Sequence, residues 1–236
     1  NVFIGNKAGY EADSATVSAI NNVYIGEAAG RYLDDGVNNV ALGFGAMQSN
    51  SDGAANAVNS AIAIGRNAMA GSVSNQGTIA IGYYAGDHAS ADVDNAVIIG
   101  REAGRGAMTS AADGTIAIGY KAGGSITSGI GNTAIGYAAL DAEDDGDYNT
   151  AIGYEALTAQ TGTSGEMGST ALGYKAGTSL TTGKGNTLLG YDAGRYQTTQ
   201  TYNTVVGWKS SKRNYKGEHI VTIGAEAGHY ATGSNN

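Results

Sequence analysis

Short groups of apolar residues recur along the whole chain in a fixed order, and each is closed by a glycine. The phrase Asn-Thr-Ala-Ile-Gly-Tyr stands at 132–137, and closely similar phrases begin at Asn149 and Ser169. Glycines of this pattern, which we call repeat glycines, are 17 to 22 residues apart, and seven of the twelve spacings are 17. A fixed period of this kind predicts a repeat architecture. The thirteen repeat glycines are Gly5, Gly26, Gly43, Gly65, Gly82, Gly100, Gly119, Gly136, Gly153, Gly173, Gly190, Gly207 and Gly224.

The residues before each repeat glycine have the pattern of a short β-strand. The residue three positions before it is Val, Ile or Thr in every copy, and the residue one position before it is Ile, Leu or Val. Side chains two residues apart on a strand share a face, and β-branched side chains favour extended backbone. The residue between them is usually Ala. We therefore expect one strand per copy, with the small middle residue against a closely packed second surface.

The residues after each repeat glycine predict a tight corner. The glycine either takes a conformation that other residues resist or lets another backbone approach closely. An aromatic residue follows it in eight copies, Ala stands three positions after it in twelve, and Gly, Leu or Met stands four positions after it in twelve. The clearest members of this structural repeat are Gly119, Tyr120, Ala122, Gly136, Tyr137, Ala139, Gly153, Tyr154, Ala156, Gly173, Gly190 and Gly207.

Asparagine stands four positions before the repeat glycine in seven copies. Its side chain can hydrogen-bond neighbouring backbone, or it can form a ladder with the asparagine of the next coil. The seven residues are Asn1, Asn22, Asn39, Asn132, Asn149, Asn186 and Asn203.

The composition requires the copies to stack on one another. The 236 residues include 39 Gly, two Phe and one Trp, but no Pro and no Cys. One copy offers too few apolar side chains to bury a core alone, so neighbouring copies must complete it. Without cysteine, packing and hydrogen bonds replace disulfides and thiolate metal sites. We predict an all-β, parallel β-roll or β-solenoid of about thirteen 17-residue repeats in one domain over 1–236, with lateral association of chains.

Insertions between the copies are rich in Ala, Ser, Asn, Asp, Gly and Thr, which predicts surface loops. Insertions in solenoids usually fall on one face. The six insertions span Glu11–Ile20, Met47–Asn59, Met69–Gln76, Asp87–Asp94, Gly104–Asp113 and Thr158–Gly168.

The repeat register would continue from one chain into another. Twelve residues follow Gly224 and Gly5 is the fifth residue, so an end-to-start junction keeps the spacing of 17. Natural solenoids normally carry atypical capping repeats, and neither end has that pattern. We therefore hold two hypotheses: the chain is part of a longer array, or subunits stack head to tail into a filament.

The formal net charge of −8 argues against nucleic acid as a partner, because nucleic-acid binding needs a basic surface. It suits an extracellular surface that keeps molecules apart by charge repulsion. No apolar run approaches the roughly 20 residues of a membrane helix. We expect no membrane insertion in this segment.

One acidic stretch is the best candidate for a ligand site. Asp141, Glu143, Asp145 and Asp147 stand at alternate positions, and the sixth residue of the stretch is Gly146. This pattern resembles the start of a calcium loop. The twelfth position is a strand residue rather than the bidentate Glu of such loops. Calcium is the one cofactor that we consider, and the alternative is a solvated acidic loop without metal.

Two further groups could contact a partner. The basic residues Lys209, Lys212, Arg213 and Lys216 could meet an acidic glycan or a neighbouring subunit, or form a plain charged loop. Tyrosines outside the repeat could stack on sugars or pack against the next coil; they are Tyr148, Tyr196, Tyr202 and Tyr215.

No arrangement of residues predicts catalysis. His88, His219 and His229 lie in different connections with no shared spacing, and no nucleophile elbow is present. The Gly-x-x-Ala-Gly runs lack the Lys-Ser/Thr of a phosphate loop, and they recur as part of the repeat. We expect a protein without catalytic residues.

The phrase at 132–140, with its relatives at 149–157 and 186–194, resembles two groups of proteins. One is the head repeats of trimeric autotransporter adhesins (YadA-like), and the other is the repeat regions of bacteriophage tail fibres. The resemblance covers essentially the whole chain. It implies a left-handed parallel β-roll, usually a homotrimer, on an extracellular or virion fibre.

We therefore expect a non-enzymatic fibre segment with a structural role, attached to a cell surface through a glycan or protein receptor. Its expected partners are copies of itself, in a homotrimer or a head-to-tail filament. The alternatives are a bacterial surface adhesin or secreted filament subunit and, third, a glycan-cleaving tail spike. The last would need paired carboxylates in a groove, which the scattered acidic residues of the loops do not supply.

Overall fold

The computed structural model describes residues 1–10, 19–33, 35–49, 58–72, 74–87, 93–109, 112–162, 165–213 and 217–228. The chain forms two compact units, Asn1–Ile118 and Gly119–Asn236. The same repeat builds both units. Each is described by itself.

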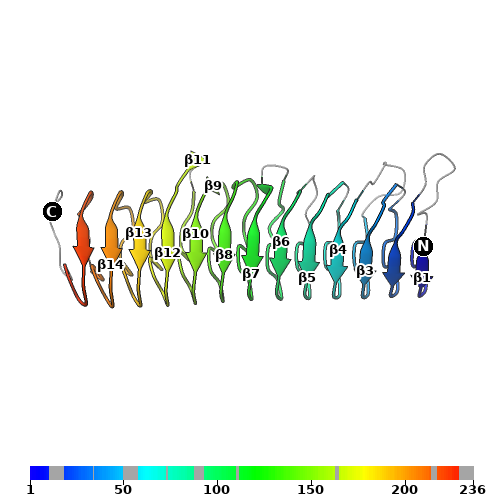
Figure 1. Ribbon diagram of the computed structural model, residues 1–236, viewed down its shortest axis with the longest axis horizontal. Helices are drawn as coiled ribbons and strands as arrows, with labels where there is room; N and C mark the ends of the chain where they lie inside the picture. Colours follow the sequence, from blue (N-terminus) through cyan, green and yellow to red (C-terminus); the bar gives the residue numbers. More distant parts are fainter. Residues whose placement is uncertain are drawn as a thin grey trace. The chain divides into compact units, whose positions relative to one another are not determined.

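The first unit is a parallel β-solenoid in which every coil contributes one three-residue strand. Each strand pairs in parallel with the next at equivalent repeat positions, so that Val40 lies opposite Ile62 although an insertion separates them. Figure 1 shows these strands as neighbouring arrows that point the same way. They are β1 (Val2–Ile4), β2 (Val23–Ile25), β3 (Val40–Leu42), β4 (Ile62–Ile64), β5 (Ile79–Ile81), β6 (Val97–Ile99) and β7 (Ile116–Ile118).

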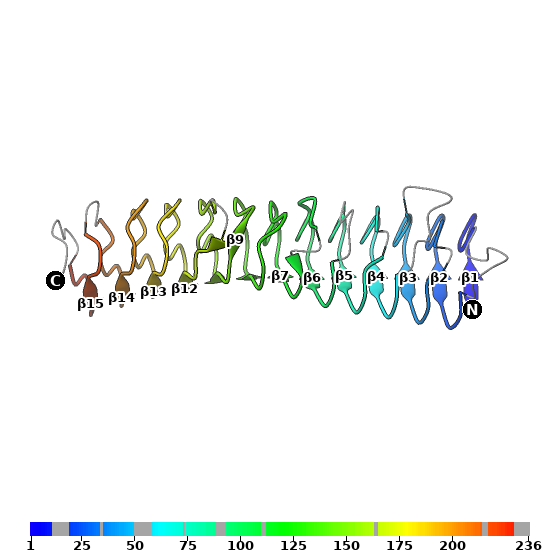
Figure 2. The same ribbon diagram turned by 90° about the horizontal axis from the view of Figure 1, so that it is seen from above.

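The second unit repeats this plan and adds a small second sheet. Its main sheet consists of β8 (Thr133–Ile135), β10 (Thr150–Ile152), β12 (Thr170–Leu172), β13 (Thr187–Leu189), β14 (Thr204–Val206) and β15 (Val221–Ile223). The second sheet pairs β9 (Gly146–Asp147) with β11 (Gly165–Glu166), at the end of the coils opposite the corners (Figures 1 and 2). The prediction of a parallel β-solenoid with one strand per repeat is confirmed.

The middle residue of each strand points into the solenoid, and its two neighbours point outward. Ala134, Ala151 and Ala171 are fully buried, whereas the residues on either side of them are partly exposed or exposed. The predicted face-sharing is therefore confirmed, and the closely packed surface is the interior of the coil.

The repeat glycine meets both conditions that the sequence suggested. Gly153 has a φ of +137°, which L side chains rarely adopt, and a Cβ at this position would lie 2.7 Å from the carbonyl carbon of Gly173 in the next coil. The backbone N–H of Gly173 donates to the carbonyl of Ile152 at 2.8 Å, so the chain turns while it stays bonded to its neighbour.

The asparagine before the strand ties each coil to the next. The backbone N–H of Asn203 donates to Oδ1 of Asn186 at 3.0 Å, and Nδ2 of Asn186 donates to the carbonyl of Gln200 at 2.8 Å. The same pair of bonds recurs at Asn22 and Asn39. Of the two roles that we predicted, bonding to neighbouring backbone is confirmed.

Several insertion residues are part of the core, which corrects the prediction that the insertions are surface loops. Val58, Val93 and Met108 are fully buried, and Met167 is 4% exposed. Alanine at the strand position leaves too little volume to fill a coil, so apolar residues of the connections complete the interior. The polar composition of the insertions predicts exposed loops and gives no sign that some of their residues belong to the core.

Candidate functional site

The outward strand face, which we define as the residues three and one positions before each repeat glycine, forms a regular surface on each unit. All its members are Val, Ile, Leu or Thr, so the face carries no charge in a chain of net charge −8. In the first unit both rows are aliphatic; in the second, Thr133, Thr150, Thr170, Thr187 and Thr204 form one row beside an aliphatic row. Leu172, for example, is 44% exposed.

Aromatic side chains stack in a row along the corners of the second unit. The rings of Tyr137, Tyr154, Tyr174 and Tyr191 lie 4.9 to 5.3 Å apart between centroids, with interplanar angles of 8° to 16°. Each ring is about two-fifths exposed. Because the faces of the rings cover one another, the row presents ring edges and hydroxyl groups rather than flat platforms.

A charged pair flanks this row. Nζ of Lys175 lies 3.1 Å from the Glu155 carboxylate and 5.4 Å from the centre of the Tyr174 ring. Hydrogen bonding to the Glu155 carboxylate raises the pKa of both Tyr154 and Lys175. Both groups keep their protons at neutral pH.

The predicted calcium ligands point in different directions. Asp145 accepts from the Ser128 hydroxyl at 2.8 Å, and Asp147 accepts from the backbone N–H of Ile130 at 2.8 Å. Glu143 is fully buried, and Asp141 forms interactions of its own. In the part of the chain that the structure describes, no three acidic, histidine or cysteine residues are grouped to hold a metal. Calcium binding here stays a prediction.

Glu143 is an internal residue that the sequence did not predict. One carboxylate oxygen accepts from the backbone N–H of Gly146 at 2.7 Å, Gly162 at 2.6 Å and Asp144 at 3.1 Å. Burial raises the pKa of this carboxyl, and these three bonds oppose the rise. The carboxylate therefore joins the loop before β10 to the insertion that leads to β11. The alternative of a solvated acidic loop is wrong at this residue.

The predicted basic cluster has roles within the chain. Nζ of Lys212 lies 2.7 Å from the Asp192 carboxylate, which also pairs with Arg195 at 3.2 Å. Nζ of Lys209 stands 4.0 Å from the centre of the Trp208 ring. Arg213 also has an interaction of its own, and Lys216 lies outside the described residues. A contact of this cluster with a glycan or a subunit stays a prediction.

The structure describes only some of the histidines and of the tyrosines outside the repeat. His88, His229 and Tyr215 lie outside the described residues. His219 packs against Tyr202 with ring centroids 5.1 Å apart and ring planes tilted by 34°, and Tyr148 and Tyr202 are each about half exposed.

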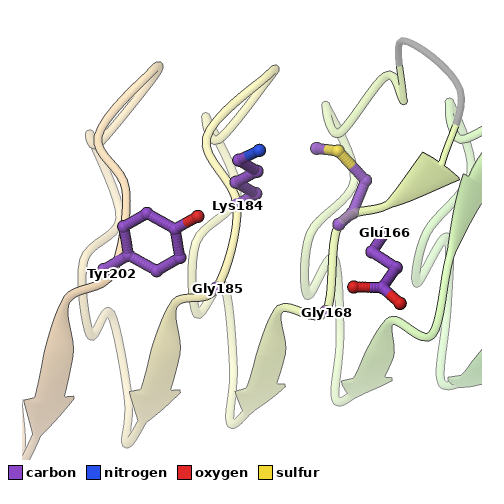
Figure 3. A pocket seen from close by; sticks show the side chains of 6 residues that line it. Glu166, Gly168, Lys184, Gly185 and Tyr202 are labelled. Atoms are coloured by element: carbon purple, nitrogen blue, oxygen red, sulfur yellow. The ribbon is translucent and has the colours of Figure 1, made fainter.

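A hollow in the second unit brings different chemical groups together (Figure 3). Its volume is about 470 Å³, and it is lined by Glu166, Met167, Gly168, Lys184, Gly185 and Tyr202. In Figure 3 the Tyr202 hydroxyl points toward Lys184, and the Glu166 carboxylate lies beyond Gly168. The sequence carries a signal for it: Gly168 and Gly185 each stand five positions before a repeat glycine, where the flanking coils have Tyr148 and Tyr202.

The described residues include no helix long and apolar enough to cross a membrane. Comparison with known proteins adds no family: no family model, no curated protein and no solved structure matches the chain. The coils and their surfaces are therefore the basis for the functional argument.

Proposed function

We propose that this chain is a non-enzymatic structural segment of an extracellular or virion fibre, and that copies of it associate through the outward strand face. The single observation that carries this proposal is the uncharged, partly exposed double row of residues on that face. A contiguous aliphatic surface, as both rows of the first unit and one row of the second unit provide, is typical of interaction sites on soluble proteins.

The charge distribution supports association between copies. Chains of net charge −8 repel each other, so contact is favoured where the surface has no charge. The outward strand face is such a surface, and its side chains are rigid β-branched or short aliphatic groups that lose little entropy on burial. We propose a homotrimer, the assembly that the resemblance implies, in which the outward strand faces of three chains meet.

The thin core of the coils supports the same proposal. Alanine occupies the inward strand position in seven of the thirteen copies, so each coil buries little apolar surface. Burial is worth roughly 25 cal/mol per Å² of apolar area. Association of the outward faces would add the burial that a single chain lacks.

The experiment is sedimentation velocity of the purified protein over a range of concentrations. We expect a mass of three 23.7 kDa chains. Leu172→Lys places a charge on the outward strand face and should shift the protein toward the monomer. A wild-type protein that stays monomeric at every concentration would overturn the proposal.

Ile130→Lys is the matched control. Ile130 is 41% exposed, close to the 44% of Leu172, but it lies outside the outward strand face. Its substitution should leave the mass unchanged. Far-UV circular dichroism of both variants establishes that the coils remain folded. Equal dissociation of the two variants would show that the effect is not specific to the face.

A further inference from the structure

The hollow exists because two consecutive coils lack a side chain at one surface position. The position five before the repeat glycine is occupied by Tyr148, Gly168, Gly185, Tyr202 and His219 in successive coils. All five have a φ between +55° and +66°, so the backbone follows the same path in each. The two glycines interrupt the row of side chains and form the floor of the hollow.

An aromatic side chain covers one end of this floor. A Cβ on Gly185 would lie 2.6 Å from Cδ1 of Tyr202, so the Tyr202 ring lies directly over this glycine. His219 of the following coil packs against Tyr202, with the two ring planes tilted by 34°. Tyr202 is 50% exposed. Gly168, in contrast, has no atom within 4 Å of a Cβ, so the space above it is open.

Two charged groups without partners border the same space. Among the described residues, neither the Lys184 ammonium nor the Glu166 carboxylate forms an ion pair or a side-chain hydrogen bond, and both are exposed. Figure 3 shows Lys184 between Tyr202 and the strand that carries Glu166. The hollow therefore offers three donors from the ammonium, two acceptor oxygens from the carboxylate, and a hydroxyl beside an aromatic ring.

The ammonium, the carboxylate and the aromatic ring of the hollow favour some classes of ligand over others. A polyanion is disfavoured by Glu166 and by the net charge of −8, and a metal ion would find only one carboxylate. A zwitterion would gain little, because exposed ion pairs contribute at most about 1 kcal/mol. A pyranose ring presents an apolar C–H face to the aromatic ring and hydroxyl groups to the ammonium and the carboxylate. The volume of about 470 Å³ lies within the usual range of small-ligand sites.

We propose that this hollow binds one pyranose ring of a neutral surface glycan, with Tyr202 as the stacking residue and Lys184 and Glu166 as hydroxyl-binding residues. The inference rests on the proposed function, because it identifies the part of the fibre that contacts a glycan on a surface. The face that associates with other copies and the hollow are separate sets of residues, so both can act in one assembly.

The experiment measures binding of the assembled protein to albumin conjugates of glucose, galactose, mannose and N-acetylglucosamine by biolayer interferometry. We expect at least one conjugate to bind and Tyr202→Asn to weaken it about tenfold, the equivalent of one aromatic contact. Asparagine suits the backbone there, since Asn21, Asn38 and Asn95 occupy the same repeat position at φ of +57° to +61°. Tyr148→Asn is the matched control, because Tyr148 has the same position and 52% exposure outside the hollow.

A second pair of variants tests the space itself. Gly168→Asn fills the hollow without striking a neighbour and should also abolish binding. Gly114→Asn is its control, because Gly114 has the same repeat position, a φ of +71° and no atom within 4 Å of a Cβ. It should leave binding intact.

Three results would overturn the inference: no conjugate binds, binding survives both Tyr202→Asn and Gly168→Asn, or only sialic acid or free glycine binds in parallel runs. Sedimentation of the same samples distinguishes the two proposals. A trimer that binds no neutral sugar overturns the sugar site alone, whereas a sugar-binding monomer overturns the proposed association.

Discussion

Leu188 fills the space that a side chain on Gly194 would need. A Cβ on Gly194 would lie 2.8 Å from Cδ2 of Leu188, and the two residues stand at the inward strand position and four positions after the repeat glycine of one coil. The same relation holds between Phe3 and Gly9. In four of the seven coils with Ala at the strand position, a large residue takes the later position, as the buried Leu157 does in the coil of Ala151, and the other three have Gly there. Strand and corner thus share one interior volume.

This relation predicts compensating substitutions in the coil of Gly153. Leu157→Gly should cost about 2–5 kcal/mol through the cavity that it leaves, and Ala151→Leu about 1–3 kcal/mol through overpacking. The double variant moves the large side chain from the corner to the strand, as in the coil of Leu188. We expect it to lose at least about 1 kcal/mol less than the sum of the single variants. Urea unfolding of all four proteins measures this coupling, and additive losses would contradict the shared volume.

The repeat glycine predicts a large loss of stability on gaining a methyl group. Gly153→Ala combines a strained φ, which costs about 1–3 kcal/mol, with a Cβ that strikes the carbonyl of Gly173. Gly224→Ala is the control, since its φ is +127° but a Cβ would meet only Ala227, at 3.8 Å, among the described residues. We expect thermal unfolding to show a loss for Gly153→Ala about 1–3 kcal/mol greater than that for Gly224→Ala. Equal losses would mean that φ alone requires glycine.

The asparagine tie predicts that Asn186→Ala is strongly destabilising. It leaves the buried N–H of Asn203 and the carbonyl of Gln200 without these partners, and each unsatisfied group costs about 1–3 kcal/mol. Asn186→Ser should lose less, because Ser169 has this position in the preceding coil and its hydroxyl accepts from the backbone N–H of Asn186 at 3.4 Å. Chemical denaturation ranks the two. A serine variant no more stable than the alanine variant would argue against the hydrogen bond as the cause.

Glu143 predicts a specific pH dependence. Burial raises its pKa above the ordinary value of 4.5, so the folded state binds the proton more tightly than the unfolded state. The stability that this group contributes is fully present below pH 4.5 and is lost as the pH rises through the raised pKa. The stability of the wild type relative to Glu143→Gln should therefore fall over this window. Melting temperatures of both proteins are measured across pH 4–8. The difference between the two proteins at each pH removes the contribution of the other carboxylates, which is common to both. A difference that rises with pH would contradict the raised pKa.

The repeat positions could be assigned from the sequence because each depends on local geometry. A β-branched residue, Ala and Ile before Gly153 specify a strand with one inward side chain, and the glycine specifies the corner. The buried insertion residues could not be assigned in this way. Met108 follows no period, and Val93 shares its position, seven before the repeat glycine, with residues as different as Asn75 and Ala112, so the residue type there gives no uniform signal of burial.

The candidate sites also differ in how far the sequence predicts them. The uncharged outward strand face follows directly from the alternation of residues in β10 and its neighbours. The hollow required the arrangement of β11, Lys184 and Tyr202, which come from three successive coils. Glu143 lies in an acidic stretch whose composition predicts a solvated loop, yet three backbone N–H groups donate to its carboxylate.

The sequence alone determined the coil: its strand, its glycine corner, its asparagine position and the parallel pairing of strands that stand at equivalent positions of the repeat. These features repeat, and each depends on residues a few positions apart in the chain. The tertiary structure alone decided which connections fill the core, which carboxylate is buried and where the surface is hollow. Those outcomes depend on contacts between neighbouring coils, which vary along the chain because the insertions differ in length and because equivalent positions carry different side chains.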